Sequence, residues 1–190
     1  MYEKIIQKLS LYGAISNQDI CLIENNFKKM NLKKNEFFES EFHNNIIFIN
    51  NGILRAFTED SQGNTYTRII AWENRFITNI SIFKEFGKSN EIIECLENAE
   101  IIYIDKELFY KLLEQSPNLK NIYFNILSEY NELYVRMTTQ LKCRGIKQKM
   151  EYLKSDFPNL INRINDSVIA SFLGMSRESY VRGKIYLRGR

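Results

Sequence analysis

The segment from Asp166 to Arg182 constrains the fold more than any other part of this chain. It reads as two short helices joined by a tight turn at Gly174. Asn165 or Asp166 can cap the first helix by accepting hydrogen bonds from its unpaired backbone N–H groups. Apolar residues at helical spacing give this helix a face to bury, namely Ile169, Phe172 and Leu173. The pattern predicts a helix-turn-helix unit.

The second helix of this unit carries polar residues suited to base recognition. In helix-turn-helix proteins the first residues of the second helix meet base edges in the major groove. Arginine can form a bidentate contact with guanine, and glutamate can accept a hydrogen bond from cytosine. We therefore expect double-stranded DNA as a partner, contacted by Ser176, Arg177, Glu178, Ser179 and Arg182. The alternative is a pair of amphipathic helices that merely packs around a glycine.

The distribution of charge favours the DNA-binding interpretation. The chain has 26 Lys and Arg and 23 Asp and Glu, a net charge of +3. Eleven basic and four acidic residues lie between Leu141 and Arg190, so this region alone carries +7 and the preceding residues carry −4. A basic region on a weakly acidic body is what binding of DNA phosphates by one end requires.

Other features exclude several classes of protein. The longest apolar runs have four residues, as in Ile46–Ile49, which is too short for a membrane span. The first eight residues are amphipathic and lack the apolar core of a signal peptide. Cys21, Cys95 and Cys143 form neither a disulfide framework nor a CxxC metal motif. We expect a cytoplasmic protein without membrane contact, metal or cofactor.

The first two thirds of the chain change from helical to extended patterns. Residues 1–30 show helical spacing that is interrupted at Gly13. Short extended runs then follow as far as Asp105, at 45–50, 54–58, 65–72, 91–96 and 100–104. Asn51-Gly52 suits a type I′ hairpin turn, and residues 59–64 suit a second hairpin loop. The expected fold is α+β, with an N-terminal jelly-roll β-barrel.

A long helix is predicted after this β region. A short helix should run from about Glu107 to Ser116, and a long one from Asn118 past Leu141. Its apolar stripe resembles a coiled-coil seam and predicts a homodimer, through Leu119, Tyr123, Ile126, Tyr130, Leu133, Met137 and Leu141. Phe124, Leu127 and Tyr134 form a second face expected to pack on the β region. The alternative is a helix buried on both sides within one subunit. A hinge at Arg144-Gly145 and a helix over 147–156 should follow.

This order of parts resembles the Crp/Fnr family of transcription regulators. The run from Ser176 to Arg182 is similar to the family's recognition-helix motif Ser-Arg-Glu-Thr-x-x-Arg. Phe48–Phe57 looks like an early strand–turn–strand of the family, and Ile92–Glu100 resembles a strand near the end of its sensor domain. The resemblance implies a cyclic-nucleotide-binding-like sensor over residues 1–116, a dimerisation helix over 117–143 and a helix-turn-helix domain over 144–190. It also implies base contacts by Arg177, Glu178 and Arg182, and RNA polymerase as a partner.

Three departures from the family pattern bear on function. Between Arg75 and Glu91 the Gly-Glu and Arg-Ser/Thr pairs that hold a cyclic nucleotide are missing, so an effector, if there is one, should be a different molecule. Arg75 and Lys88 can neutralise an anion or lie as solvated surface charges. No cysteine cluster is available for an iron–sulfur centre. Gly183 replaces a packing aliphatic residue, and no β-hairpin wing is evident after the second helix.

These departures leave a second function open, a ligand-binding or protein-interaction module with a decayed DNA-binding end. Catalysis is not expected. A metal-dependent jelly roll needs a cluster of His ligands, and the chain has one histidine, His43. The paired acids Glu39/Glu41 and Glu97/Glu100 should be solvated surface groups. We therefore predict no catalytic residues and no metal site.

Overall fold

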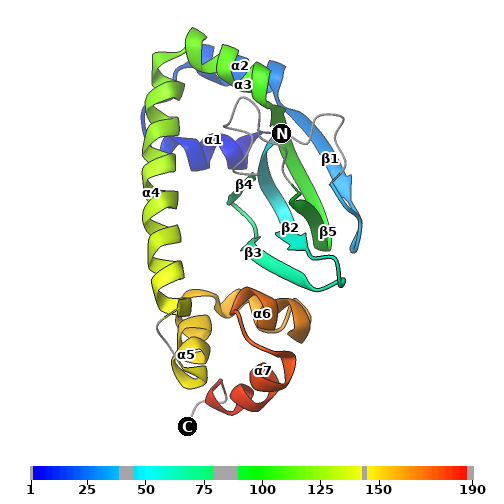
Figure 1. Ribbon diagram of the computed structural model, residues 1–190. Coiled ribbons are helices and arrows are strands. Elements are labelled where there is room, and N and C mark those ends of the chain that lie inside the picture. Colours follow the sequence, from blue (N-terminus) through cyan, green and yellow to red (C-terminus); the bar gives the residue numbers. More distant parts are fainter. Residues whose placement is uncertain (1, 39–44, 79–89, 143–144, 188–190) are drawn as a thin grey trace.

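The computed structural model describes residues 2–38, 45–78, 90–142 and 145–187 (Figure 1). Two helices come first, α1 (Glu3–Ser10) and α2 (Asn17–Asn26), and Gly13 lies between them as predicted. A capping box begins α2. The Ser16 side chain accepts a hydrogen bond from the Asp19 backbone N–H, and the Asp19 carboxylate accepts one from the Ser16 N–H. This reciprocal pair explains why the second helix begins at this point.

Five antiparallel strands form one sheet: β1 (Lys28–Leu32), β2 (Asn45–Glu59), β3 (Thr65–Ala71), β4 (Phe76–Thr78) and β5 (Ile92–Asp105). Their order is β1-β5-β2-β3, and β4 pairs with β2. The described strands form an open sheet, whereas we expected a closed barrel. Both faces are packed. Ile46 and Phe48 face the helices, whereas Ile47 and Ile49 face a core built mainly from other strands.

The predicted hairpin turn at Asn51-Gly52 is wrong. Strand β2 continues through it, and its pairing with β5 shifts register between Ile49 and Leu54. Gly52 has φ of +94°, and a Cβ there would lie 2.6 Å from the backbone of Ala99. The glycine therefore forms a bulge at a close approach of two long strands, where a side chain cannot fit. The second predicted hairpin, between β2 and β3, is confirmed.

The remaining helices match the sequence pattern closely. They are α3 (Lys106–Gln115), α4 (Pro117–Lys142), α5 (Ile146–Asp156), α6 (Asp166–Phe172) and α7 (Arg177–Gly183). Figure 1 shows α4 standing along one side of the sheet, with α5, α6 and α7 gathered beyond the sheet's lower end. The described chain ends in a 3-10 turn at Lys184–Tyr186, and no strand follows α7 as far as residue 187. No described helix is long and apolar enough to cross a membrane.

Candidate nucleic-acid interface

Helices α6 and α7 form the predicted helix-turn-helix. Asn165 caps α6, where its side chain accepts a 2.9 Å hydrogen bond from the Val168 N–H. Gly174 has φ of +59° at the turn, and Met175 N–H donates back to the Ala170 carbonyl. A left-handed glycine after a helix is a common termination, because other residues are strained there. The turn therefore forms for the reason that its sequence indicated.

The predicted base-reading residues occupy the solvent side of α7. Ser176 caps this helix by accepting a hydrogen bond from the Ser179 N–H. Arg177, Glu178 and Arg182 are exposed, whereas Ser179 is half-buried. The backbone N–H of Glu178, followed by the Ser176 hydroxyl, lowers the pKa of the Glu178 carboxyl. Glu178 is therefore ionised near neutral pH and can only accept hydrogen bonds.

The structure adds Val181 to this surface, since its side chain is exposed. An apolar side chain at this position can contact a thymine methyl group. Its place four residues after Arg177 was a usable signal, because residues at this spacing share a helix face. The sequence interpretation overlooked it because it considered only polar side chains.

Two residues of α5 and α7 set the position of the turn and of α7. The Lys149 ammonium donates to the carbonyls of Leu173 and Gly174, at 2.8 and 3.3 Å. Lys149 thus holds the turn. A Cβ at Gly183 would lie 2.9 Å from Ile146 and from Met150, so glycine permits the close crossing of α5 and α7. The departure at Gly183 therefore has a packing explanation within an intact fold.

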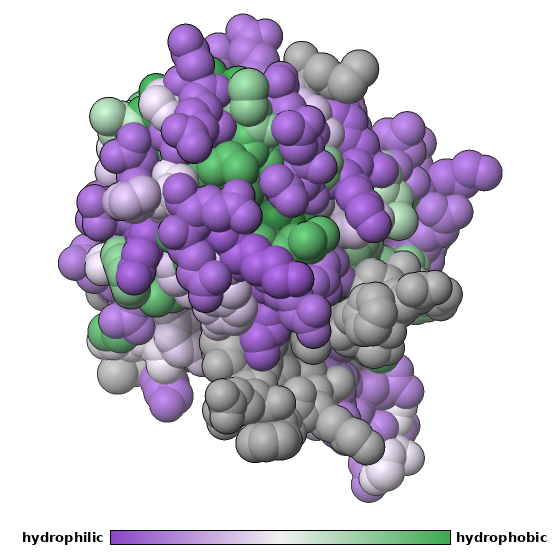
Figure 2. Space-filling model, turned by 90° about the horizontal axis from the view of Figure 1, so that it is seen from above, coloured by the Kyte–Doolittle hydropathy of each residue, from purple (hydrophilic) through white to green (hydrophobic). Residues whose placement is uncertain are grey.

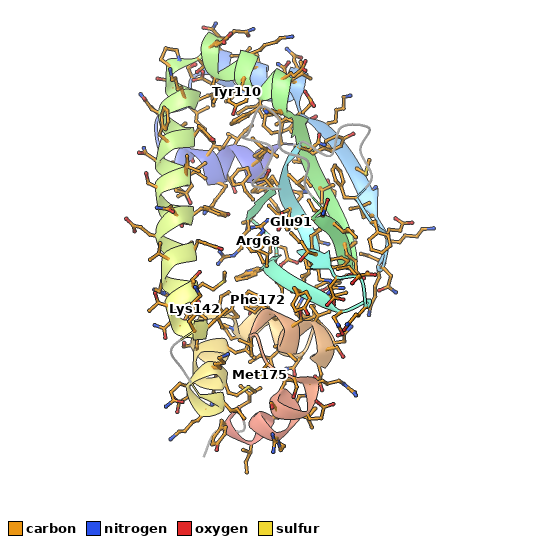
Figure 3. The ribbon with its side chains drawn as sticks, in the orientation of Figure 1. Arg68, Glu91, Tyr110, Lys142, Phe172 and Met175 are labelled. Carbon is orange, nitrogen blue, oxygen red and sulfur yellow. The ribbon has the colours of Figure 1, made fainter. Side chains whose placement is uncertain are left out.

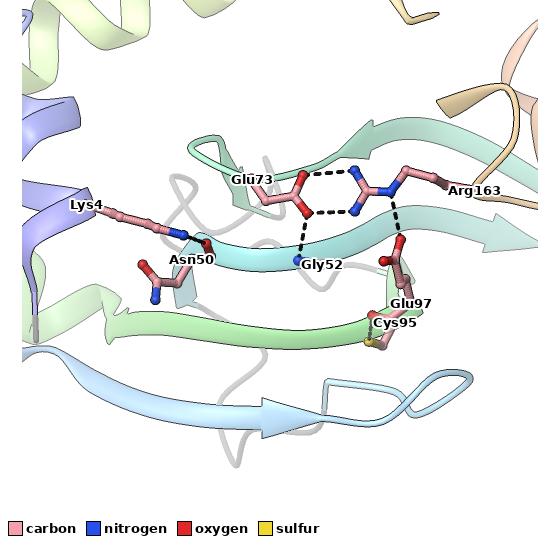
Figure 4. Close-up of polar contacts among 7 residues, drawn as sticks. All are labelled: Lys4, Asn50, Gly52, Glu73, Cys95, Glu97 and Arg163. Atoms are coloured by element: carbon pink, nitrogen blue, oxygen red, sulfur yellow. Dashed lines mark hydrogen bonds and ion pairs between the residues drawn. The ribbon is translucent and has the colours of Figure 1, made fainter. Parts of the chain in front are cut away.

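The helix-turn-helix is docked on the sheet by polar contacts (Figure 4). Arg163, just before α6, donates two hydrogen bonds to Glu73 and a third, of 2.8 Å, to Glu97. Glu73 also accepts from the Gly52 N–H at 3.0 Å, so the bulge in β2 belongs to the same network. The Ser171 hydroxyl donates to the Thr65 carbonyl and accepts from the Thr67 N–H. Glu97, expected as a solvated surface acid, is an ion-pair partner.

An apolar contact accompanies these bonds. Ile53, Ile70 and Leu96 of the sheet are buried in one cluster with the core of the helix-turn-helix. The Trp72 ring meets Phe157 edge-on, with ring centroids 5.8 Å apart. The Arg75 guanidinium lies over the Trp72 ring, 3.7 Å from its centroid. Burial lowers the pKa of Arg75. Arg75, considered above as an anion ligand, therefore packs as a cation on an aromatic face.

Most of the predicted seam residues of α4 pack within their own subunit. Leu119 is buried in the core of its own subunit, and Tyr123 and Ile126 pack against the same core. The Tyr130 hydroxyl accepts a 2.8 Å hydrogen bond from the Phe76 N–H of β4. Met137 and Leu141 pack against the helix-turn-helix cluster. The stripe therefore mostly faces the subunit's own sheet and helices. Of the predicted seam residues, Leu133 is exposed.

A second face of α4, next to the covered one, is apolar and partly exposed. Phe124, Leu127 and Tyr134, which we expected to pack on the β region, have 51%, 45% and 45% of their surface accessible. Val135 extends this surface. We call Phe124, Leu127, Tyr134 and Val135 the α4 apolar face.

Several sequence-based candidates lie outside the described residues, namely Glu39, Glu41, His43, Lys88, Cys143 and Arg144. Within the described ranges, no group of three or more His, Cys, Asp or Glu side chains is arranged to hold a metal ion.

No protein-family model and no curated protein sequence matches the chain. Solved structures do match. FixK2 from Bradyrhizobium japonicum aligns with a TM-score of 0.69 at 10% identity, over 85% of this chain and 84% of that one. The c-di-GMP-responsive global regulator CLP from Xanthomonas campestris aligns with a TM-score of 0.69 at 15% identity, over 91% and 92%.

A transcriptional regulator of the Crp/Fnr family from Eubacterium rectale aligns with a TM-score of 0.68 at 16% identity, over 92% of this chain and 84% of that one. These identities are too low to carry functional details across. The alignments do cover 85–92% of this chain. The chain therefore has the fold of the Crp/Fnr transcription regulators.

Proposed function

We propose that this protein is a transcription regulator that binds double-stranded DNA sequence-specifically as a cytoplasmic homodimer. Arg177, Glu178 and Arg182 carry the proposal, because a capped helix of a helix-turn-helix presents all three to solvent. In the division proposed from the sequence, residues 1–116 form the sensor, 117–143 the dimerisation helix and 144–190 the DNA-binding domain. RNA polymerase is the partner through which such a regulator acts.

Selection from a pool of random DNA duplexes tests the DNA-binding part of this proposal. We expect enrichment of a two-fold-symmetric sequence, because a symmetric dimer presents two copies of α7. The separation of the half-site centres should be about 34–36 Å, one helical turn of DNA. Weak binding without any enriched sequence would instead support an interaction module with a decayed DNA-binding end.

For the dimer we propose a contact between two copies of the α4 apolar face. An exposed stripe of large apolar side chains on a long helix is the kind of surface that helix pairing buries. Phe124→Asp should shift the dimer strongly toward monomer in sedimentation experiments, because it would bury an unpaired charge at a position outside the cavity lining. Asn121→Asp, an added charge at an exposed position of the same helix, is the matched control. A wild-type monomer at micromolar concentration would refute the dimer.

The effector, by this proposal, is not a cyclic nucleotide. The phosphate of such a ligand needs a paired cation or oriented N–H donors to offset its loss of water. Arg75 is stacked on Trp72, and Arg68 is already paired with Glu91. Calorimetric titration with cyclic AMP and cyclic GMP should therefore show no binding at micromolar concentration, and micromolar affinity for either nucleotide would contradict this.

A further inference from the structure

An apolar cavity of about 310 Å³ lies between the helices and one side of the sheet. Helices α1, α2, α3 and α4 all contribute to its wall, and β2, β3 and β4 form the opposite side. Its lining is almost entirely hydrocarbon, with Leu9, Ile23, Phe76, Leu113, Ile122 and Ile126 among the contributing side chains. Seen from the α2–α3 end, apolar side chains show through the centre of a hydrophilic surface (Figure 2). The helices thus enclose space without filling it with their own side chains.

The cavity's one lining cation, among the described residues, is already neutralised. The guanidinium of Arg68 forms an ion pair with Glu91, and its Nη2 also donates 2.8 Å to the Thr78 carbonyl. Figure 3 shows Arg68 and Glu91 together between α4 and the sheet. The side chains of both residues are mostly buried, with 21% and 11% of their surface accessible. An entering carboxylate or phosphate would therefore meet a cation that already has a buried anionic partner.

Two other polar groups in the lining, the hydroxyls of Tyr130 and Thr78, also have partners. The Tyr130 hydroxyl accepts from the Phe76 N–H, and the Thr78 hydroxyl donates 2.9 Å to the Asn45 carbonyl. Burial further raises the pKa of Tyr130, so this hydroxyl stays neutral. A charged ligand would lose its water in this environment and regain little. An uncharged apolar ligand has no such cost and displaces poorly hydrogen-bonded water.

The volume limits the size of the ligand. An engineered apolar cavity of about 150 Å³ accommodates benzene, so about 310 Å³ suits roughly twice as many atoms, about twelve other than hydrogen. Pockets of about 300 Å³ are also at the small end of those that bind organic ligands. We propose that this cavity binds an uncharged, predominantly apolar molecule of that size. Its role as the effector rests on the proposed function, whereas its binding does not.

Calorimetry and thermal unfolding of the full chain with 1-decanol and decanoate test the proposal. The two probes have the same chain length and differ in charge. We expect 1-decanol to raise the melting temperature and to bind at least about tenfold more tightly than decanoate, because the carboxylate would be buried without a free cation. No binding of 1-decanol, or equal or tighter binding of decanoate, would overturn the proposal.

Variants with larger side chains in the cavity wall test whether 1-decanol binds in this cavity. Ile126→Trp and Leu113→Phe should each reduce 1-decanol affinity about tenfold or more, because a larger side chain fills part of the cavity. Two positions are tested so that one variant remains informative if the other does not fold. Leu11→Trp, on a side chain that is 76% exposed and outside the lining, should leave affinity unchanged. Unchanged affinity in both filled variants, when both are folded, would place the probe elsewhere and refute the assignment.

A charge variant tests whether the Arg68–Glu91 ion pair makes the cavity prefer an uncharged ligand. Glu91→Gln removes the carboxylate that pairs with Arg68, so decanoate affinity should rise relative to that of 1-decanol. An unchanged ratio would show that Arg68 does not determine the ligand's charge. These measurements need no DNA. Enrichment of a DNA sequence without 1-decanol binding would remove this inference alone, whereas 1-decanol binding without DNA enrichment would remove only the proposed function.

Discussion

The guanidinium of Arg163 and the carboxylate of Glu73 form a two-bond ion pair, with Nη2···Oε1 and Nη1···Oε2 distances of 2.6 and 3.0 Å. It joins the segment before α6 to the turn between β3 and β4. Phe76, the first residue of β4 after that turn, donates its N–H to Tyr130 of α4. The turn and the first residue of β4 therefore contact both the helix-turn-helix and the long helix, and the integrity of this segment should affect how the helix-turn-helix docks on the sheet.

Arg163→Ala should destabilise the protein by about 1–3 kcal/mol, because the partly buried Glu73 loses its cation. Urea unfolding measures the change in the free energy of unfolding. Amide hydrogen exchange at Gly52, whose N–H bonds Glu73, should accelerate in the same variant. Arg136→Ala is the matched control. Arg136 pairs with Asp156 but its side chain is 59% exposed, so its loss should cost under about 1 kcal/mol. Equal losses in both variants would show that Arg163 has no special role.

The same pair predicts a dependence of stability on acid. The hydrogen bonds from Arg163 lower the pKa of the Glu73 carboxyl from 4.5 to about 2, although burial opposes them. A carboxyl whose pKa is lower in the folded state stabilises the fold above its unfolded pKa and loses this contribution as pH falls. The free energy of unfolding should therefore drop between about pH 4.5 and pH 2.

Urea titrations at a series of pH values measure this drop, and Glu73→Gln should flatten it by about 2–3 kcal/mol over the window. Asp19 adds a similar slope. Burial works to raise the pKa of Asp19, but hydrogen bonds from Ser116, Ser16 and Asn118 outweigh it and hold the value at about 2. Asp19→Asn is therefore a second, independent way to flatten the profile. If Glu73→Gln leaves the fall of unfolding free energy with acid unchanged, that fall does not come from the Arg163–Glu73 pair.

Much of the helical architecture was predictable because its signals are local. Asn165, one of the two cap candidates in the sequence, caps α6, and Gly174 takes the turn. Asn51-Gly52 failed as a turn signal for the opposite reason. The dipeptide suits a hairpin locally, but the long pairing of β2 with β5 carries the strand through it as a bulge. Only the partner strand distinguishes the two outcomes.

The sequence also could not predict which face of α4 is covered by its own subunit. Both of its faces are apolar, so periodicity identifies two candidate surfaces and cannot show which one its own subunit buries. Leu119 and Leu127 are identical side chains on the same helix, and one is buried while the other is exposed. Arg163 is likewise an isolated arginine with no motif around it. Its two acidic partners are 90 and 66 residues away, and only the fold brings them together.

A pair of tyrosines offers a test of the polar interior. Tyr180 of α7 is completely buried, and its hydroxyl has no hydrogen-bond partner among the described residues. Tyr180→Phe should stabilise the protein by about 1 kcal/mol, because it removes a buried polar group that is unsatisfied. Tyr130→Phe is the contrasting variant. Its hydroxyl satisfies the Phe76 N–H, so its loss should destabilise by about 1–2 kcal/mol. Thermal and urea unfolding compare the two, and a destabilised Tyr180→Phe would mean that its hydroxyl is satisfied in solution.

Base reading by α7 can be separated from simple attraction to DNA. Arg177→Ala and Arg182→Ala should each cost about 1–3 kcal/mol on the selected sequence and relax the preference at one base pair in each half-site. Lys147→Ala provides the contrast. Lys147 lies in the exposed first turn of α5, in a long 3.9 Å pair with Glu151, so its loss should weaken binding to all sequences alike and flatten the salt dependence.

Lys149→Ala should behave differently from the two arginine variants and from Lys147→Ala, because the Lys149 ammonium donates hydrogen bonds to the Leu173 and Gly174 carbonyls of the turn. We expect it to lower the melting temperature as well as DNA affinity, whereas Arg177→Ala leaves the melting temperature unchanged because Arg177 is exposed. Fluorescence anisotropy against the selected and a scrambled duplex, at several salt concentrations, resolves the three behaviours. If Arg177→Ala weakens binding to both duplexes equally, α7 does not read bases, and the basic surface alone accounts for the affinity.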